Sequence, residues 1–122
     1  MSIEIQVKRV YEPADPQDGT RVLVDRLWPR GLTKEQVKAD LWLKEAAPSS
    51  ELRKWFHQNM QQWEVFQRRY LVELEGQTEA VAKLLELANE NRLTLLFSSR
   101  EAEHNHAMVL KEYLLARLGA KA

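Results

Sequence analysis

The stretch Leu93-Thr94-Leu95-Leu96-Phe97 decides the fold, because it is the most apolar of the predicted strands. A short apolar run bounded by polar residues is typical of a strand that is buried on both faces of a sheet. Helical periodicity lies on both sides of this run, over residues 78–88 before it and from about Glu103 to Leu118 after it. The alternation of helix, strand and helix indicates α/β units on a parallel sheet, with residues 93–97 as a central strand.

Two further strands are predicted near the N-terminus. Residues 3–10 alternate apolar and polar side chains, which is the periodicity of a strand. Residues 21–27 form the second strand, and the adjacent apolar residues Leu23 and Val24 indicate that both of its faces are buried. The segment between these strands, residues 11–20, is shorter than the dozen or more residues that usually connect parallel neighbours. The sequence therefore leaves open an antiparallel arrangement of the first two strands.

Two helices are predicted directly after these strands. Thr33 and Gln36 have the spacing of a capping box, which predicts a helix from Lys34 to about Ala46. Pro48 interrupts this helix, and Ser49 is a good N-cap for the short helix that follows.

Two longer helices are expected after residue 58. Asn59 resembles the cap of a helix that ends at Gly76, and Thr78 resembles the cap of the next one. The core-facing stripe of the first of these helices contains Trp63, Phe66, Tyr70, Leu71 and Leu74. Residues 1–122 are thus predicted to form one small three-layer α/β domain, in which helices flank a mostly parallel sheet of few strands.

Composition excludes several classes of function. Lysine and arginine together number 18, and aspartate and glutamate together also number 18, so the formal net charge is zero. A neutral chain lacks the positive field of a general nucleic-acid-binding protein. The chain has no cysteine, which excludes disulfides and thiol catalysis. No apolar run approaches the roughly 20 residues that span a bilayer, and the N-terminal residues do not resemble a signal peptide, so we expect a cytoplasmic protein without membrane contact.

Polar side chains gather at the ends of the predicted strands, where ligands bind in open α/β sheets. The candidate ligand-binding residues are Arg9 and Tyr11 after the first strand, Asp25, Arg26, Trp28 and Arg30 after the second, and Ser98, Ser99, Asn105 and His106 after the third. Guanidinium groups bind phosphate and carboxylate through paired hydrogen bonds, and helix N-termini attract anions. The sequence therefore predicts a small anionic ligand, phosphorylated or carboxylated, and it predicts no metal and no cofactor.

Structural roles are open alternatives for several of these residues. Asp25 can form an ion pair with Arg26 or Arg9 that only holds the strand end in place. Ser98 and Ser99 can serve as caps of the last helix.

The histidines are a separate question. His106 is a candidate general acid or base, so a weak hydrolase or transferase activity is one form of the ligand-binding hypothesis. A hydrogen-bonded structural histidine is the alternative. His104 lies two residues earlier, which matches no zinc-binding spacing on a helix. The sequence thus does not decide whether the chain is an enzyme.

Short motifs are distributed over nearly the whole chain. They are residues 7–13 (VKRVYEP), 21–31 (RVLVDRLWPRG), 42–45 (WLKE), 47–49 (APS), 52–56 (LRKWF), 63–66 (WEVF), 95–97 (LLF) and 104–110 (HNHAMVL). In this combination the chain resembles the YeaO-like branch of the domain-of-unknown-function 488 family, with residues 23–31 as the most specific segment. The resemblance implies an α/β fold with parallel strands, and it implies no known activity.

Other branches of that family look similar at two places. Their second strand ends in a Val-Asp-Val-Arg-like run, which is comparable with Val24-Asp25-Arg26 in this chain. Their last helix opens with a Cys-His pair, where this chain has Asn105-His106. Asparagine cannot replace cysteine as a nucleophile or as a metal ligand of ordinary affinity. The resemblance therefore implies that this chain either binds the same ligand without reacting it or uses another mechanism.

Three classes of function follow from these observations. The leading hypothesis is a small domain that binds a phosphate or carboxylate ligand at the strand ends. The alternative is a nucleic-acid-binding or regulatory module without catalysis, which would add Lys8, Arg53 and Lys54 to the basic rim. A third hypothesis is a protein-interaction domain with an exposed apolar patch around Trp28 or Trp42. The sequence indicates no oligomeric state.

Overall fold

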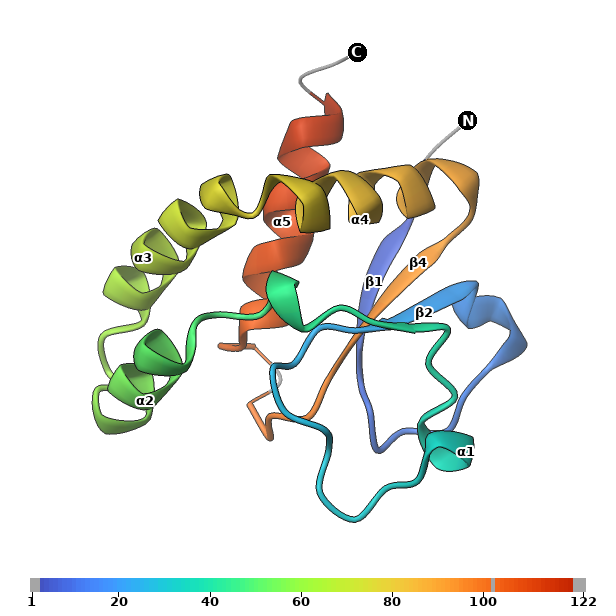
Figure 1. The fold of residues 1–122 in the computed structure, drawn as a ribbon, viewed down its shortest axis with the longest axis horizontal. Helices are drawn as coiled ribbons and strands as arrows, with labels where there is room; N and C mark the ends of the chain where they lie inside the picture. Colours follow the sequence, from blue (N-terminus) through green and yellow to red (C-terminus); the bar gives the residue numbers. More distant parts are fainter. Residues whose placement is uncertain (1–2, 102, 120–122) are drawn as a thin grey trace.

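The computed structural model describes residues 3–101 and 103–119 of the chain. In this described part, parallel strands form one four-stranded sheet in the order β1-β4-β2-β3 (Figure 1). The strands are β1 (Ile5–Arg9), β2 (Thr20–Leu23), β3 (Leu41–Trp42) and β4 (Leu93–Phe97). All five residues of β4 are buried, and β4 pairs with both β1 and β2, which confirms the prediction of a central strand.

The first two strands are parallel to each other, and β4 lies between them. The antiparallel arrangement that the short connection left open is therefore not observed. A five-residue strand rises roughly 16 Å, whereas ten extended residues span up to about 33 Å. Residues 10–19 can thus return the chain to the start of β2, with room for the short 3-10 helix η1 (Pro16–Asp18).

Helices α3 (Trp63–Gly76), α4 (Thr78–Glu90) and α5 (His106–Gly119) lie on one side of the sheet (Figure 1). Helix α5 packs on β1 and β4, and α3 and α4 pack against α5. Sheet residues such as Val22 and Leu95 join these helices in the main hydrophobic core. Helix α2 (Ser50–Gln58) packs against α3. No helix in the described part of the chain is long and apolar enough to cross a membrane.

The opposite face of the sheet is covered by the short helix α1 (Lys34–Val37) and by loops. A second, smaller hydrophobic cluster on this face contains Val10, Leu23, Val37 and Leu96. Trp28 and Trp42 pack on this cluster, with their ring centroids 5.3 Å apart in an edge-to-face arrangement. Helices on one face and α1 with loops on the other confirm the predicted three-layer α/β fold.

The second strand ends at Leu23, four residues earlier than predicted. The Val24 amide still bonds to β4, and the next ladder bond would join Ser98 N to Val24 O. Instead, Ser98 N donates to the Asp25 carboxylate at 2.9 Å. The carbonyl of Val24 lies 2.8 Å from His106 Nε2. β2 therefore ends at Leu23, because side chains of Asp25 and His106 replace the backbone hydrogen-bond partners that would continue its pairing with β4.

The helix predicted from Lys34 to about Ala46 is wrong beyond Val37. Lys38 adopts the left-handed conformation, with φ 51° and ψ 42°, and its N–H donates to Lys34 O. The next residues pair with β2 as strand β3, and the chain then forms the 3-10 helix η2 (Lys44–Ala46). The free edge of β2 supplies hydrogen bonds that outweigh the local helical preference.

Three predicted helix starts are also corrected. Helix α3 begins at Trp63, and Asn59 is the C-cap of α2 instead of the N-cap of α3. Thr78 is the first residue of α4, whose N-cap is Gln77. Helix α5 begins at His106, three residues later than predicted. The cap position depends on the backbone angles of the preceding loop, which packing determines and residue type alone does not.

A buried polar network occupies the α1 side of the sheet. The Asp18 side chain, which is 3% exposed, accepts hydrogen bonds from Arg21 Nη1 at 2.5 Å and from Lys8 Nζ at 3.1 Å. Gln6 Nε2 donates to Asp18 Oδ1 at 3.0 Å, and Thr94 Oγ1 donates to Asp18 O at 2.6 Å. Gln6, Thr94 and Arg21 occupy one row across three strands, so their side chains share one face. The network thereby ties the loop before β2 to β1, β2 and β4.

We expect acid to weaken this network. Burial alone would raise the pKa of Asp18, but hydrogen bonds from the Asp15 amide, Lys8 and Arg21 outweigh burial. The pKa of Asp18 therefore lies below its usual value of 3.8 in the folded protein. The stability that Asp18 contributes is fully present above that value and is lost as the pH falls through the lower, folded-state pKa.

Urea denaturation between about pH 2 and pH 7 measures this effect, with Asp18→Asn as the reference that cannot ionise. The stability difference between the two proteins should shrink as the pH falls below about 4. A difference that stays constant over this range would contradict the expectation.

Candidate functional site

Three of the predicted site residues meet where β2 and β4 end. Asp25 Oδ2 accepts hydrogen bonds from Ser98 N at 2.9 Å and from Ser98 Oγ at 2.5 Å. Asp25 Oδ1 lies 3.2 Å from Nε2 of His106, the first residue of α5. The side chains of Asp25 and His106 are 10% and 15% exposed, so solvent reaches little of them. Asp25 thus pairs with His106 and not with Arg9 or Arg26, which corrects the structural ion pair considered from the sequence.

The neighbours of His106 determine which ring nitrogen carries the hydrogen. Nε2 lies 2.8 Å from Val24 O, a carbonyl oxygen that can only accept a hydrogen bond. Asp25 Oδ1 lies 3.2 Å from the same nitrogen but accepts no hydrogen bond from it. Nε2 therefore carries the hydrogen and donates it to Val24 O. The Ser98 hydroxyl donates to Asp25 rather than to His106, so the three residues do not form a serine–histidine–aspartate relay.

A cavity of about 200 Å³ opens beside this cluster. It is lined by Arg26, Ala47, Ser49, Tyr70, Glu73, Leu74 and Gln77. Arg26 donates from Nε to Pro48 O at 3.0 Å and from Nη2 to Ala47 O at 3.3 Å. These bonds orient the guanidinium group, and its Nη1 has no partner among the described residues. An oriented guanidinium with a spare donor suits a carboxylate or a phosphate.

Tyr70 connects the cavity with the Asp25 cluster. Its ring packs edge-on against His106 with the centroids 6.1 Å apart, and its hydroxyl donates to a carbonyl of η2 at 2.5 Å. Burial raises the pKa of Tyr70 well above its usual value of 10.0, and the negative charges of Glu73 and Asp25 raise it further. Tyr70 therefore remains a neutral hydrogen-bond donor at ordinary pH.

Glu73 supplies a negative charge to the same cavity. Its two carboxylate oxygens accept from Ser49 N at 2.8 Å and from Ser49 Oγ at 2.6 Å. The sequence did not predict Ser49, Tyr70 or Glu73 as site residues, although Ser49 is confirmed as a helix cap and Tyr70 as a core residue. One signal could have found Glu73, because it lies three residues after Tyr70 and so adjoins the apolar stripe of α3.

Four other predicted residues form a separate group at the end of β1. Arg9 Nε donates to Ser99 O at 3.1 Å, and the Arg9 guanidinium lies 4.5 Å from the centre of the Tyr11 ring. The Tyr11 hydroxyl donates to Arg30 O at 3.1 Å. The structure thus divides the predicted basic rim into two groups, one at β1 and one around Arg26.

Trp28 and Asn105 have structural contacts. The indole of Trp28 donates to a backbone carbonyl four residues later at 2.7 Å. Asn105 is 3% exposed, and its Oδ1 accepts from Met108 N at 3.1 Å in the first turn of α5. Asn105 therefore caps α5, and the expectation that Ser98 and Ser99 cap it is wrong.

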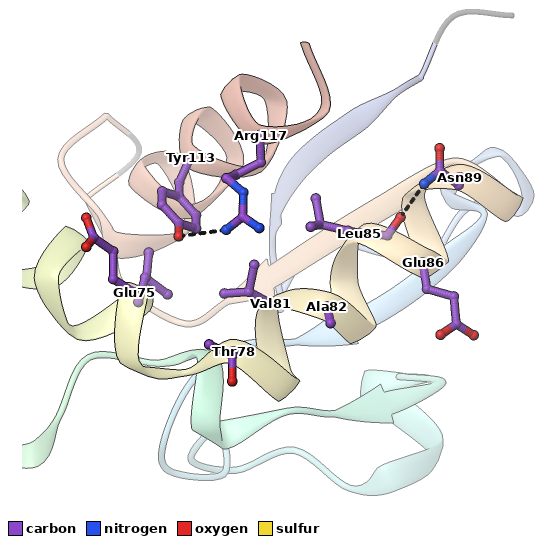
Figure 2. A pocket seen from close by; sticks show the side chains of 10 residues that line it. Glu75, Thr78, Val81, Ala82, Leu85, Glu86, Asn89, Tyr113 and Arg117 are labelled. Carbon is purple, nitrogen blue, oxygen red and sulfur yellow. Dashed lines mark hydrogen bonds between the residues drawn. The ribbon is translucent and has the colours of Figure 1, made fainter. Parts of the chain in front are cut away.

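A larger cleft, of about 340 Å³, lies between α4 and α5 (Figure 2). Figure 2 shows Tyr113 and Arg117 projecting from α5 over this cleft, joined by a hydrogen bond of 3.0 Å. Val81 and Leu85 form part of its floor. None of the residues predicted from the sequence lines this cleft, and no strand end opens into it. The cavity beside Arg26 is therefore the candidate site.

Comparisons with known proteins agree with the fold and the motifs. Residues 4–122 match the family profile described as the inactive DUF488-N3 subclade. The uncharacterized protein YeaO of Escherichia coli K12 is 46% identical over 112 residues, which cover 92% of this chain and 97% of YeaO. The uncharacterized protein Rv3073c of Mycobacterium tuberculosis is 41% identical over 113 residues, which cover 93% and 95% of the two chains. No solved structure matches the chain. The chain therefore belongs to the DUF488 family and to its YeaO-like branch.

Proposed function

We propose that this chain is a ligand-binding domain that holds a small phosphorylated or carboxylated molecule without reacting it. The observation that carries the proposal is the Arg26 guanidinium, which the carbonyls of Ala47 and Pro48 orient at the wall of the 200 Å³ cavity. A guanidinium that is oriented before binding loses less conformational entropy when an anion arrives. Ser49 and Gln77 add polar groups to the same wall.

The neighbouring cluster supports binding rather than catalysis. The Ser98 hydroxyl is committed to Asp25, and Asn105 is committed to the cap of α5, so neither serves as an activated nucleophile. The subclade that matches the chain is described as inactive. In this proposal His106 does not touch the ligand and supports the cavity wall by packing against the Tyr70 ring.

A thermal-shift screen tests the proposal with inorganic phosphate, small carboxylates, sugar phosphates and nucleotides. At about 100 times its dissociation constant, a ligand adds roughly 2.7 kcal/mol of stability, which raises the Tm by several degrees. We expect at least one anion of the panel to do this. Arg26→Ala should abolish the shift, because it removes the group that holds the anion.

Two further variants serve as controls. Arg68→Ala removes an exposed arginine that lies about 200° around α3 from Tyr70, and it should keep the ligand shift. Arg26→Lys keeps the charge but loses the paired donors, so it should retain only part of the shift. Circular dichroism of each variant checks that it is folded. The proposal fails if no anion raises the Tm, or if Arg26→Ala keeps the shift.

The nucleic-acid alternative has fewer basic groups to draw on than the sequence indicated. Lys8 donates to Asp18, and its side chain is 16% exposed. Arg53 Nε is buried. An affinity for single-stranded DNA that falls steeply with salt would nevertheless favour this alternative over the small ligand.

A further inference from the structure

Two opposite charges line the cavity without pairing with each other. Arg26 is held by the backbone carbonyls of Ala47 and Pro48, and Glu73 is held by Ser49 through its amide and its hydroxyl. In the described part of the chain, no nitrogen of Arg26 lies within 4.0 Å of an oxygen of Glu73. Both side chains are partly buried.

The hydrogen bonds restrain both groups, and neither group forms an ion pair with another described residue. Opposite charges near a protein surface attract by several kcal/mol at about 4 Å, so long side chains that share a cavity tend to close on each other. Here the backbone carbonyls and Ser49 hold Arg26 and Glu73 in separate positions. The cavity therefore presents a cation and an anion that are both oriented toward neutral partners, and among the described residues neither has an opposite charge within 4.0 Å.

We infer that the cavity takes an amphoteric ligand, with a carboxylate or phosphate for Arg26 and an ammonium group for Glu73. The inference rests on the proposed function and narrows it from any small anion to an amino-acid-like one. Such a ligand compensates both wall charges at once, whereas a simple anion approaches the Glu73 carboxylate unfavourably. A volume of about 200 Å³ is below the range of drug-sized pockets, so the ligand is small.

A cation alone is a poorer occupant of this cavity. A simple ammonium ion would be attracted by Glu73 but repelled by Arg26. A metal ion prefers several carboxylate or imidazole ligands, and among the described residues no three such side chains gather in one place. The two separate wall charges, of Arg26 and Glu73, thus favour a molecule that carries both a positive and a negative group.

Calorimetric titration with matched pairs of ligands tests the inference. The pairs are acetate with glycine, propionate with β-alanine, butyrate with 4-aminobutyrate, and ethyl phosphate with phosphoethanolamine. Within a pair, the anion is the same and only the ammonium group differs; across the carboxylates, the separation between the charges increases. In at least one pair, the amino ligand should bind about tenfold more tightly than its partner, because it gains a charge-assisted hydrogen bond.

The variant Glu73→Gln keeps an acceptor for Ser49 but removes the charge. It should reduce the affinity ratio of that pair to about one while the simple anion binds at least as well as before. Glu75→Gln, which removes an exposed carboxylate of α3 outside this cavity, is the matched control and should keep the ratio. Thermal unfolding of both variants checks that they are folded.

The outcomes separate the inference from the proposed function. If simple anions bind through Arg26 and no amino group improves the affinity, the inference is overturned and the proposed function stands. If the affinity ratio is unchanged in Glu73→Gln, another residue binds the ammonium group and the inference is again overturned. If no ligand of either kind binds, both the inference and the proposed function are wrong.

Discussion

Replacing Asp18 with alanine is expected to destabilise the protein by about 3–5 kcal/mol, the usual effect of removing one partner from a buried ion pair. The carboxylate of Asp18 is 3% exposed and compensates both Arg21 and Lys8. Without it, the guanidinium of Arg21 stays buried with only backbone carbonyls as partners. The side chain of Gln6 also loses an acceptor.

Urea denaturation at neutral pH measures this loss. Glu86→Ala is the contrasting control, because the ion pair of Glu86 with Lys83 is 4.0 Å long and both side chains are largely exposed. An exposed pair of this kind contributes less than about 1 kcal/mol. The interpretation of Asp18 would be wrong if both variants lost equally little stability.

The variant Gly19→Ala is expected to lose about 3 kcal/mol or more, because two effects act at one position. Gly19 has φ 67° and ψ −131°, a conformation that residues with a Cβ rarely adopt. A Cβ at this position would also lie 2.3 Å from Arg92 O. That carbonyl accepts the hydrogen bond from Thr20 N at 2.8 Å, so it cannot move away without disturbing the start of β2.

Two other glycines separate these effects. Gly31 has φ 81° but open space around its Cβ position, so Gly31→Ala should lose only about 1–2 kcal/mol from the backbone conformation. Gly76 has neither a positive φ nor a close neighbour, and Gly76→Ala should be neutral or stabilising by up to about 1 kcal/mol. Equal losses for Gly19→Ala and Gly31→Ala, measured by chemical denaturation, would show that the close approach to Arg92 has no effect.

The elements with strong periodicity could be predicted from the sequence. Strand β4 was predicted over the residues that form it, since four apolar residues and a threonine in a run of only five are typical of a buried strand. Of the predicted core stripe of α3, Phe66, Tyr70 and Leu74 are buried as expected, because they follow helical spacing. Strand β3 was missed, because two residues carry no periodicity and only the free edge of β2 makes them a strand.

The candidate site could be predicted only in part. Parallel strands bring their carboxyl ends to one edge, and this rule was enough to place Asp25, Ser98 and His106 in the same region. The separation of Arg9 from Arg26 depends on the strand order. With β4 between β1 and β2, the two strand ends are two strand spacings apart, or roughly 9.6 Å. No pattern in the sequence indicates the order of the strands in the sheet.

The sequence by itself determined the class of fold, the central strand, the buried faces of the long helices and the absence of a thiol nucleophile. Each of these depends on composition or on the spacing of residues along the chain. Helices and strands place residues of a given spacing on one face, so such features can be predicted locally. Only the tertiary structure decided which polar groups became partners. Ser49 meets Glu73 from 24 positions away, and Asp25 meets Ser98 from 73 positions away. Contacts at such separations depend on strand order and helix packing, and these belong to the whole chain rather than to any segment of it.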